Sequence, residues 1–229
     1  AIGALVAIGI GKMTFGGFGK TPFNPALVGR VFLLLSFPVA MTTFPEVADA
    51  VTGATPLAAV KGALLGGMPM SEAMQMVSYQ DLLLGIKSGS FGEVSAVALL
   101  LGGVYLLIRR VISWRIPIAV LGSMAIFTGI LWAVNPDAYM SPLFHLLTGG
   151  AMLGAIFMAT DYSTSPMTHK GMLLFGAGIG IITILIRLWG IYPEGMSFAI
   201  LIMNAMVPLI DRSFKPKRFG VVKAGRAKA

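Results

Sequence analysis

Apolar residues in this chain gather into long runs, separated by shorter stretches that hold most of the charged residues. Runs of this kind predict membrane-spanning helices, because a bilayer core about 30 Å thick takes roughly 20 apolar helical residues. Several runs are short for a perpendicular span, so their predicted ends are approximate. The six predicted spans are residues 26–44, 94–108, 116–134, 143–160, 171–189 and 195–210. The predicted fold class is all-α, a polytopic integral membrane helical bundle.

The chain opens on a further apolar run, residues 1–11, with no upstream partner. Eleven helical residues extend roughly 16 Å, about half of the bilayer core. We interpret this run as the end of a helix whose beginning is missing. On this interpretation residues 1–229 form a single membrane domain that is truncated at its N-terminus.

Residues 45–93 form a more polar insertion between the apolar runs and hold most of the acidic residues. The segment is too polar to cross a membrane and much longer than a simple turn. Connections longer than about 12–15 residues are usually functional or disordered. We therefore expect the insertion to lie outside the membrane and to carry function.

Composition narrows the classes of protein and of chemistry. Hydrophobic residues make up 56% of the chain and charged residues only 11%, with a mean hydropathy of +0.86, whereas a soluble domain has about 25% charged residues. The chain has no cysteine, which excludes Fe–S ligation, a catalytic thiol and disulfides within it. Any redox chemistry would then belong to an organic cofactor or to non-thiolate ligands. His145 and His169 are isolated, so no metal site and no catalytic residue is predicted.

The distribution of basic residues orients the predicted bundle. If the spans alternate, all Lys and Arg residues except Lys61, Lys87 and Arg187 fall on one side, which is fourteen of seventeen, and seven of the nine acids fall on the other. Excess Lys and Arg marks the cytoplasmic side. The insertion is therefore predicted to face outward and the C-terminus to be cytoplasmic. Since this topology explains the net charge of +8, nucleic acid is not an expected partner.

The insertion contains the string D-A-V-T-G-A-T, from Asp49 to Thr55. It resembles the acceptor sequence of bacterial flavin transferases, which esterify FMN through its phosphate to the last Thr. Gly53 leaves the backbone unencumbered, and Pro56 disfavours helix at Thr55, which keeps the acceptor extended. Asp49 would be read by the transferase or would help to place its metal. The alternative is that T-G-A-T-P is an ordinary polar turn entering a helix.

Two further stretches place Pro at the predicted start of a helix, beside polar residues. They are F-N-P-A, which contains Asn24, and T-S-P, which contains Thr164 and follows Asp161. Paired interrupted helices often line a path at the bilayer midplane. A flavin or an ion near these breaks and simple capping at the membrane surface are both open interpretations.

Several motifs together resemble, in order and spacing, the RnfD family of the Rnf ion-translocating oxidoreductase complex, over nearly all of the chain. They are F-G-K-T-P-F-N-P-A-L-V-G-R, S-F-P-V-A-M-T-T, D-A-V-T-G-A-T-P-L, M-A-T-D-Y-S-T-S-P, I-R-L-W-G-I-Y-P-E-G and N-A-M-V-P-L-I-D-R. The B subunit of the Na⁺-translocating NADH:quinone reductase represents the sister family and shares the acceptor site. The resemblance implies one and a fraction of two related repeats with broken helices, in a bacterial or archaeal cytoplasmic membrane.

The resemblance also implies a function. Rnf complexes pass electrons between ferredoxin and NAD⁺ and couple this to Na⁺ or H⁺ translocation. Thr55 matches the residue that carries covalent FMN, on the outer face of the membrane. A second, non-covalent flavin such as riboflavin is associated with these families, but no residue here is assigned to it. The implied partners are Fe–S and flavin subunits of the complex, a flavin transferase during maturation, and the lipid bilayer.

Three other functions compete with this interpretation. The chain could serve in a Na⁺-translocating NADH:quinone reductase, it could be a cofactor-free transporter of a small solute, or it could be a structural or assembly subunit. Broken helices and abundant glycine suit a transporter equally well. The acceptor sequence ending at Thr55 is the feature that favours an electron carrier.

Overall fold

The computed structural model describes residues 1–17, 19–45, 52–86, 88–90, 92–190, 192 and 194–215. Within these residues the structure is helical, apart from a short antiparallel ladder in which β1 (Phe44–Pro45) pairs with β2 (Thr52–Gly53). The predicted all-α class is confirmed. The division into related repeats remains a prediction.

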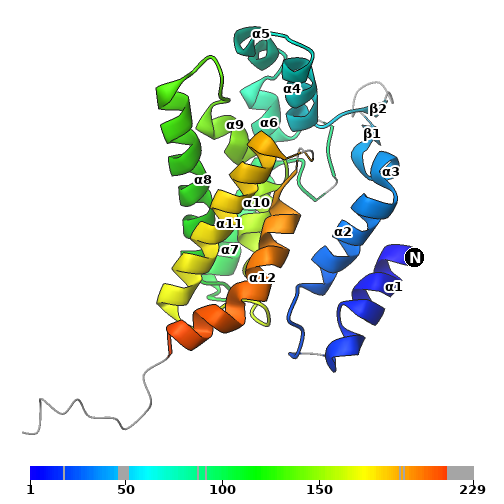
Figure 1. Cartoon of the computed structure of the whole chain (residues 1–229), viewed down its shortest axis with the longest axis vertical. Coiled ribbons are helices and arrows are strands. Elements are labelled where there is room, and N and C mark those ends of the chain that lie inside the picture. The colour runs from blue at the N-terminus through cyan, green and yellow to red at the C-terminus, as the bar shows by residue number, and fades with distance from the viewer. Residues whose placement is uncertain are drawn as a thin grey trace, which may run out of the picture.

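In the described part of the chain, three helices are long and apolar enough to cross a membrane, namely α8 (Arg115–Val134), α11 (His169–Trp189) and α12 (Met196–Ser213). α11 packs against both of the others and lies between them (Figure 1). A Cβ added to Gly176 would lie 2.6 Å from the Cβ of Ala119, and one on Gly180 would collide with Ser123 Oγ. Small residues four positions apart thus let α8 and α11 approach closely, as is common in membrane bundles.

Shorter helices complete the bundle. α1 (Ile2–Leu5) runs into the π-helical turn η1 (Val6–Ile10), and η2 (Met13–Phe15) is a single 3₁₀ turn. This first segment packs against α2 (Pro25–Ser36). α7 (Ala96–Ile108) is a helix of 13 residues.

The predicted span 26–44 is not continuous. α2 ends at Ser36 and α3 (Pro38–Thr42) begins after Phe37, whose φ and ψ are −135° and 60°. Pro38 has no backbone N–H to donate and disfavours helical geometry in the preceding residue. The break at Phe37 turns the chain toward β1.

The predicted span 143–160 is also broken. α9 (Pro142–Leu147) ends before two glycines, after which α10 (Ala151–Leu153) leads into the π-helical turn η3 (Gly154–Met158). Gly149 and Gly150 have φ values of 61° and 65°, a region that side-chain-bearing residues rarely adopt. An apolar run that reads as one helix is therefore two short ones.

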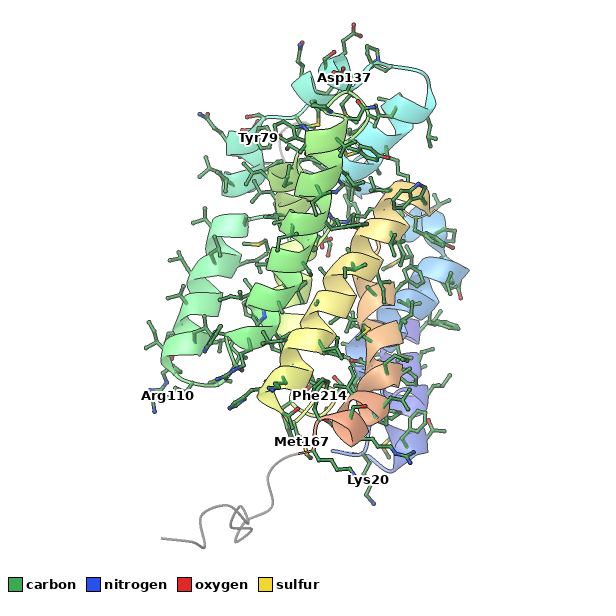
Figure 2. The ribbon with its side chains drawn as sticks, turned by 60° about the vertical axis from the view of Figure 1, so that its left-hand side comes forward. Lys20, Tyr79, Arg110, Asp137, Met167 and Phe214 are labelled. Atoms are coloured by element: carbon green, nitrogen blue, oxygen red, sulfur yellow. The ribbon has the colours of Figure 1, made fainter. Side chains whose placement is uncertain are left out.

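The insertion is a folded helical unit. α4 (Pro56–Leu65), α5 (Met70–Gln75) and α6 (Tyr79–Leu84) gather at one end of the bundle, next to α9 (Figure 1). These three helices share a hydrophobic core with the start of α7 and with α9, which we call the second core. Its buried members are Leu57, Val60, Met70, Ala73, Leu82, Ala96, Met140, Phe144 and Leu147. The other end of the bundle carries Lys20, Arg110 and Met167 (Figure 2).

Candidate functional site

Thr55 is the N-cap of α4. Its backbone is extended, with φ −60° and ψ 148°, and its Oγ1 accepts a hydrogen bond from the Ala58 N–H at 3.4 Å. Pro56 follows at the first helical position, where a missing N–H costs nothing. The predicted extended backbone at Thr55 is therefore confirmed, and it fits equally the alternative of a polar turn that enters a helix.

The exposure of Thr55 differs from what an acceptor on a free loop would show, because only 6% of the residue is exposed. The cause lies in the next turn of α4. Leu57 and Val60 are buried in the second core and draw the start of the helix inward. Asp49, the upstream acid of the acceptor sequence, lies outside the described residues.

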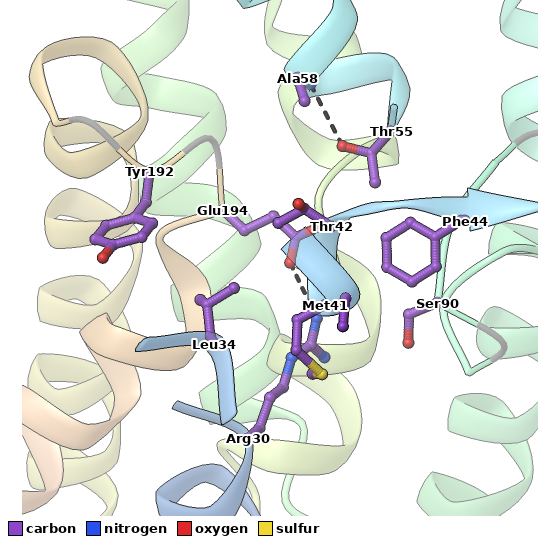
Figure 3. A pocket seen from close by; sticks show the side chains of 11 residues that line it. Arg30, Leu34, Met41, Thr42, Phe44, Thr55, Ala58, Ser90, Tyr192 and Glu194 are labelled. Atoms are coloured by element: carbon purple, nitrogen blue, oxygen red, sulfur yellow. Dashed lines mark hydrogen bonds and ion pairs between the residues drawn. The ribbon is translucent and has the colours of Figure 1, made fainter. Parts of the chain in front are cut away.

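Thr55 lines a cavity of ≈190 Å³ that is shared by α2, α3, the start of α4 and the approach to α12. Its walls are largely apolar or aromatic, with Leu34, Met41, Phe44 and Tyr192 among them. Figure 3 shows Thr55 and Arg30 on different sides of this space, with Glu194 between them. The cavity therefore combines a hydroxyl, apolar surfaces and two groups of opposite charge.

An ion triad lies beside the cavity. Arg30 Nη2 is 3.0 Å from Glu194 Oε2 and 3.4 Å from Glu93 Oε1. Alternation of spans predicted Arg30 at the basic, cytoplasmic end, and this is wrong: the residue lies at the Thr55 end among acids. Arg30 is part of the apolar helix α2, and its charge is neutralised by contacts within the bundle.

The broken helix lies directly next to this triad. Arg187, which is 3% exposed, donates from Nη1 to the His145 carbonyl and from Nη2 to the carbonyls of Thr148 (2.8 Å) and Gly149 (2.9 Å). A cation thus satisfies the carbonyl groups at the C-terminal end of α9, where a helix dipole is negative. Arg187 therefore holds the end of α9 in place.

Glu93 lies at the other side of the same break. A Cβ on Gly150 would collide with Glu93 Oε2, so the carboxylate rests against the start of α10. A small polar cavity of ≈10 Å³ lies among Thr55, Glu93 and residues 148–150. The predicted attachment residue and the broken helix are thus neighbours. The Gly-Gly pair inside an apolar run was the sequence signal for this break.

Lys61 connects the insertion to the end of α11. Its Nζ donates to the carbonyl oxygens of Arg187 (2.9 Å) and Gly190 (2.5 Å). Partial burial lowers the pKa of the Lys61 ammonium, because a low-dielectric setting disfavours the charged form. α4 is thereby fixed to the last turn of a membrane-spanning helix.

The two Pro-containing stretches meet at the opposite end of the bundle. Asn24 caps α2 by accepting from the Ala26 N–H at 3.1 Å, and its Nδ2 donates to the Met158 carbonyl at 3.3 Å. The Asn204 amide, oriented to satisfy both its polar atoms, accepts from the Asn24 N–H and donates to the Thr164 carbonyl. Asp161 accepts from the hydroxyls of Ser163 and Thr164. These side chains cap and join the segments.

The predicted helix start at the T-S-P stretch is wrong by a few residues. Pro166 precedes α11, which begins at His169, and Thr168 is its N-cap with Oγ1 accepting from the Gly171 N–H at 3.2 Å. His145 is buried whereas His169 is exposed. Among the described residues, no group of three or more His, Asp or Glu side chains is placed to hold a metal ion.

The structure thus defines a multi-pass helical membrane protein with a buried threonine at a cavity beside a broken helix. A family model described as the NQR2, RnfD, RnfE family matches residues 1–220, and the chain belongs to that family. This confirms the resemblance inferred from the motifs.

Three relatives illustrate the match, each over 96–98% of this chain. The chain is 45% identical to the D subunit of the proton-translocating ferredoxin:NAD(+) oxidoreductase complex of Clostridium ljungdahlii. It is 46% identical to the D subunit of the Na(+)-translocating ferredoxin:NAD(+) oxidoreductase complex of Acetobacterium woodii. It is 41% identical to the D subunit of the ion-translocating oxidoreductase complex of Halorhodospira halophila. The chain spans about two thirds of the length of these relatives, namely 68%, 66% and 70%.

Proposed function

We propose that this chain acts as the RnfD component of a membrane complex that couples electron transfer between ferredoxin and NAD⁺ to ion translocation, and that Thr55 carries covalently bound FMN. Family membership and the names of its relatives support the first part. The observation that carries the second part is the position of Thr55, whose side chain lines a cavity with apolar and aromatic walls.

The residue types around Thr55 suit a flavin, and the cavity of ≈190 Å³, which is smaller than a typical ligand site, would have to widen to hold one. Phe44 and Tyr192 offer aromatic surface, Leu34 and Met41 offer apolar surface, and Arg30 supplies a cation within the same cavity. Ligand sites typically combine mostly apolar walls with a few placed polar groups. Arg30 is held by Glu93 and Glu194, so its guanidinium is fixed before any cofactor is attached.

In the proposed attachment reaction, FAD donates its FMN half to Thr55. The Thr55 hydroxyl oxygen forms a bond to the phosphorus of the FMN half, the bond to the AMP half breaks, and AMP and the hydroxyl proton leave. Because Thr55 is only 6% exposed, we infer that the transferase acts when the start of α4 is displaced from its packing. The product is a phosphoester that leaves the isoalloxazine ring chemically free.

FMN supplies a centre that exchanges electrons singly or in pairs, and the protein supplies position and electrostatics. Thr55 would anchor the cofactor, and the apolar walls would keep water from it. Arg30 would offset the negative charge that Glu93 and Glu194 bring to the cavity. We assign substrate oxidation to partner subunits with Fe–S centres and further flavins. A second, non-covalent flavin such as riboflavin belongs to the proposal without an assigned residue.

The proposed orientation places the Thr55 end outside a bacterial or archaeal cytoplasmic membrane and the C-terminus in the cytoplasm. The charge census supports it after Arg30 is moved to the outer side, since alternation of the spans still assigns thirteen of the seventeen basic residues in the sequence to the other side. Identities of 45% to a proton-translocating relative and 46% to a Na⁺-translocating one assign neither ion.

Thr55→Val tests the attachment site. The protein is co-expressed with an active flavin transferase, denatured in SDS and imaged under ultraviolet light. We expect a fluorescent band for the unaltered chain and none for Thr55→Val, because valine has no hydroxyl to esterify. Thr42→Val is the matched control, since Thr42 lines the same cavity and should leave fluorescence unchanged. Equal fluorescence from Thr55→Val would show that the site assignment is wrong.

A further inference from the structure

A large cavity lies at the end of the bundle away from Thr55. It measures ≈610 Å³ and is lined by the C-terminal end of α7, the connection to α8, and the first residues of α8 and α11. Volumes of this order are typical of sites that hold small molecules. Nothing in the proposed electron path uses this cavity.

The polar side chains of the cavity favour an anion. Arg110, Arg115 and His169 line it, and none of the thirteen described residues in its wall is acidic. α8 and α11, which have 20 and 21 residues, both begin here and bring the partial positive charge of their N-terminal ends, whereas the C-terminal end of α7 brings partial negative charge. Arg115 is further held in place, with its Cζ 5.1 Å from the Trp114 ring centroid and Nη1 3.3 Å from Ser113 Oγ.

The backbone at Arg110 adopts a left-handed conformation at the end of α7. Arg110 has a φ of 55°, the one positive value at a non-glycine residue among those described. Its N–H donates to the Leu107 carbonyl, and the Val111 N–H donates to the Leu106 carbonyl, both at 3.0 Å. This is the hydrogen-bond pattern of a Schellman cap, whose left-handed position is usually glycine. The chain thus keeps an arginine where glycine would be less strained.

The other residues in the cavity wall are of the types that lie at the boundary between a membrane and water. Val111 and Leu107 are apolar residues in the lining, and exposed Trp114 and Tyr162 flank the cations. Trp and Tyr gather at the level of lipid headgroups. A ligand here meets cations on one side and apolar surface on the other, which suits an amphipathic phosphate better than a free one.

We propose that this cavity binds the phosphate headgroup of an anionic phospholipid. Arg110 and Arg115 contact the phosphate, and the acyl chains leave along the apolar surface of α7. Basic pockets between membrane helices are known to hold anionic headgroups. This site is independent of whether Thr55 carries FMN.

The test uses the full-length protein isolated in its complex, with phosphatidylglycerol as the probe. Native mass spectrometry measures the fraction of the protein that retains lipid. In Arg110→Gly the cation is lost while the cap gains its preferred residue, so the protein should fold at least as well as before. We expect retention to fall about tenfold, the effect of losing one direct hydrogen bond between a cation and the phosphate.

Arg109→Gln is the matched control, because it removes an adjacent charge at the helix end that does not line the cavity. It should retain phosphatidylglycerol as the unaltered protein does. Phosphatidylethanolamine should be retained far less, and excess inorganic phosphate should not displace the bound lipid. Equal loss in the two variants, equal retention of both lipids, or displacement by phosphate would each overturn the proposal.

Discussion

The two ends of the bundle use arginine in opposite ways. At the Thr55 end, Arg187 is buried against backbone carbonyls and Arg30 is paired with two acids. At the other end, Arg110 is exposed at the mouth of a cavity whose described lining has no acid. The buried Arg187 therefore fixes a particular backbone arrangement, whereas the exposed Arg110 remains available for a ligand. The Thr55 end is thus a site whose charged groups are already held by the protein, whereas the Arg110 end is a surface whose charges can meet a ligand.

The largest difference between the ends should appear on removing a cation. Arg187→Met leaves the carbonyl groups of His145, Thr148 and Gly149 without their donor, and should destabilise the protein by about 3–5 kcal/mol. Arg109→Gln at the exposed end should change stability by less than about 0.5 kcal/mol. Reversible unfolding in mixed micelles with SDS measures both. Similar stability of the two variants would contradict the structural role given to Arg187.

The next effect concerns the break itself. Gly150→Ala forces a side chain into left-handed backbone and against Glu93, at a cost of about 3 kcal/mol. Gly122→Ala in α8 is the matched control, since a Cβ there meets nothing within 4 Å; it should gain up to about 1 kcal/mol from helix propensity. Thermal unfolding of the detergent-solubilised protein distinguishes them. A neutral Gly150→Ala would mean that the break does not need its glycines.

A smaller effect should reach the cofactor without detaching it. Arg30→Gln removes the cation between Glu93 and Glu194, so the cavity becomes more negative and the reduction potential of FMN on Thr55 should fall. Arg30→Lys keeps the charge and should shift the potential less. A spectroelectrochemical titration of the protein with covalent flavin gives both values. An unchanged reduction potential in Arg30→Gln would show that the charge of Arg30 does not influence the flavin.

Much of the bundle could be predicted from apolar runs alone. The predicted span 116–134 matches α8 (Arg115–Val134), and 171–189 matches α11 (His169–Trp189). Such helices follow from local composition, because a continuous apolar run has to satisfy its own backbone in a membrane. The family could likewise be identified from short ordered motifs.

The buried charges and the contacts that hold the end of α9 could not be predicted in this way, because they depend on distant partners. The end of α9 is held by Arg187, which lies 42 residues after His145. Arg30 pairs with acids 63 and 164 residues away, so counting charges by span put it at the wrong end. The burial of Thr55 depends on the second core, which the sequence of the acceptor string does not contain.

The central claim is that Thr55 carries FMN. Cleavage by trypsin after Arg30 and Lys61 releases residues 31–61, which include Thr42, Thr43, Thr52 and Thr55. Fragmentation of this peptide from the protein matured with a flavin transferase should place the mass of FMN less one water on Thr55. The same mass on another threonine, or an unmodified peptide beside an active transferase, would contradict the account.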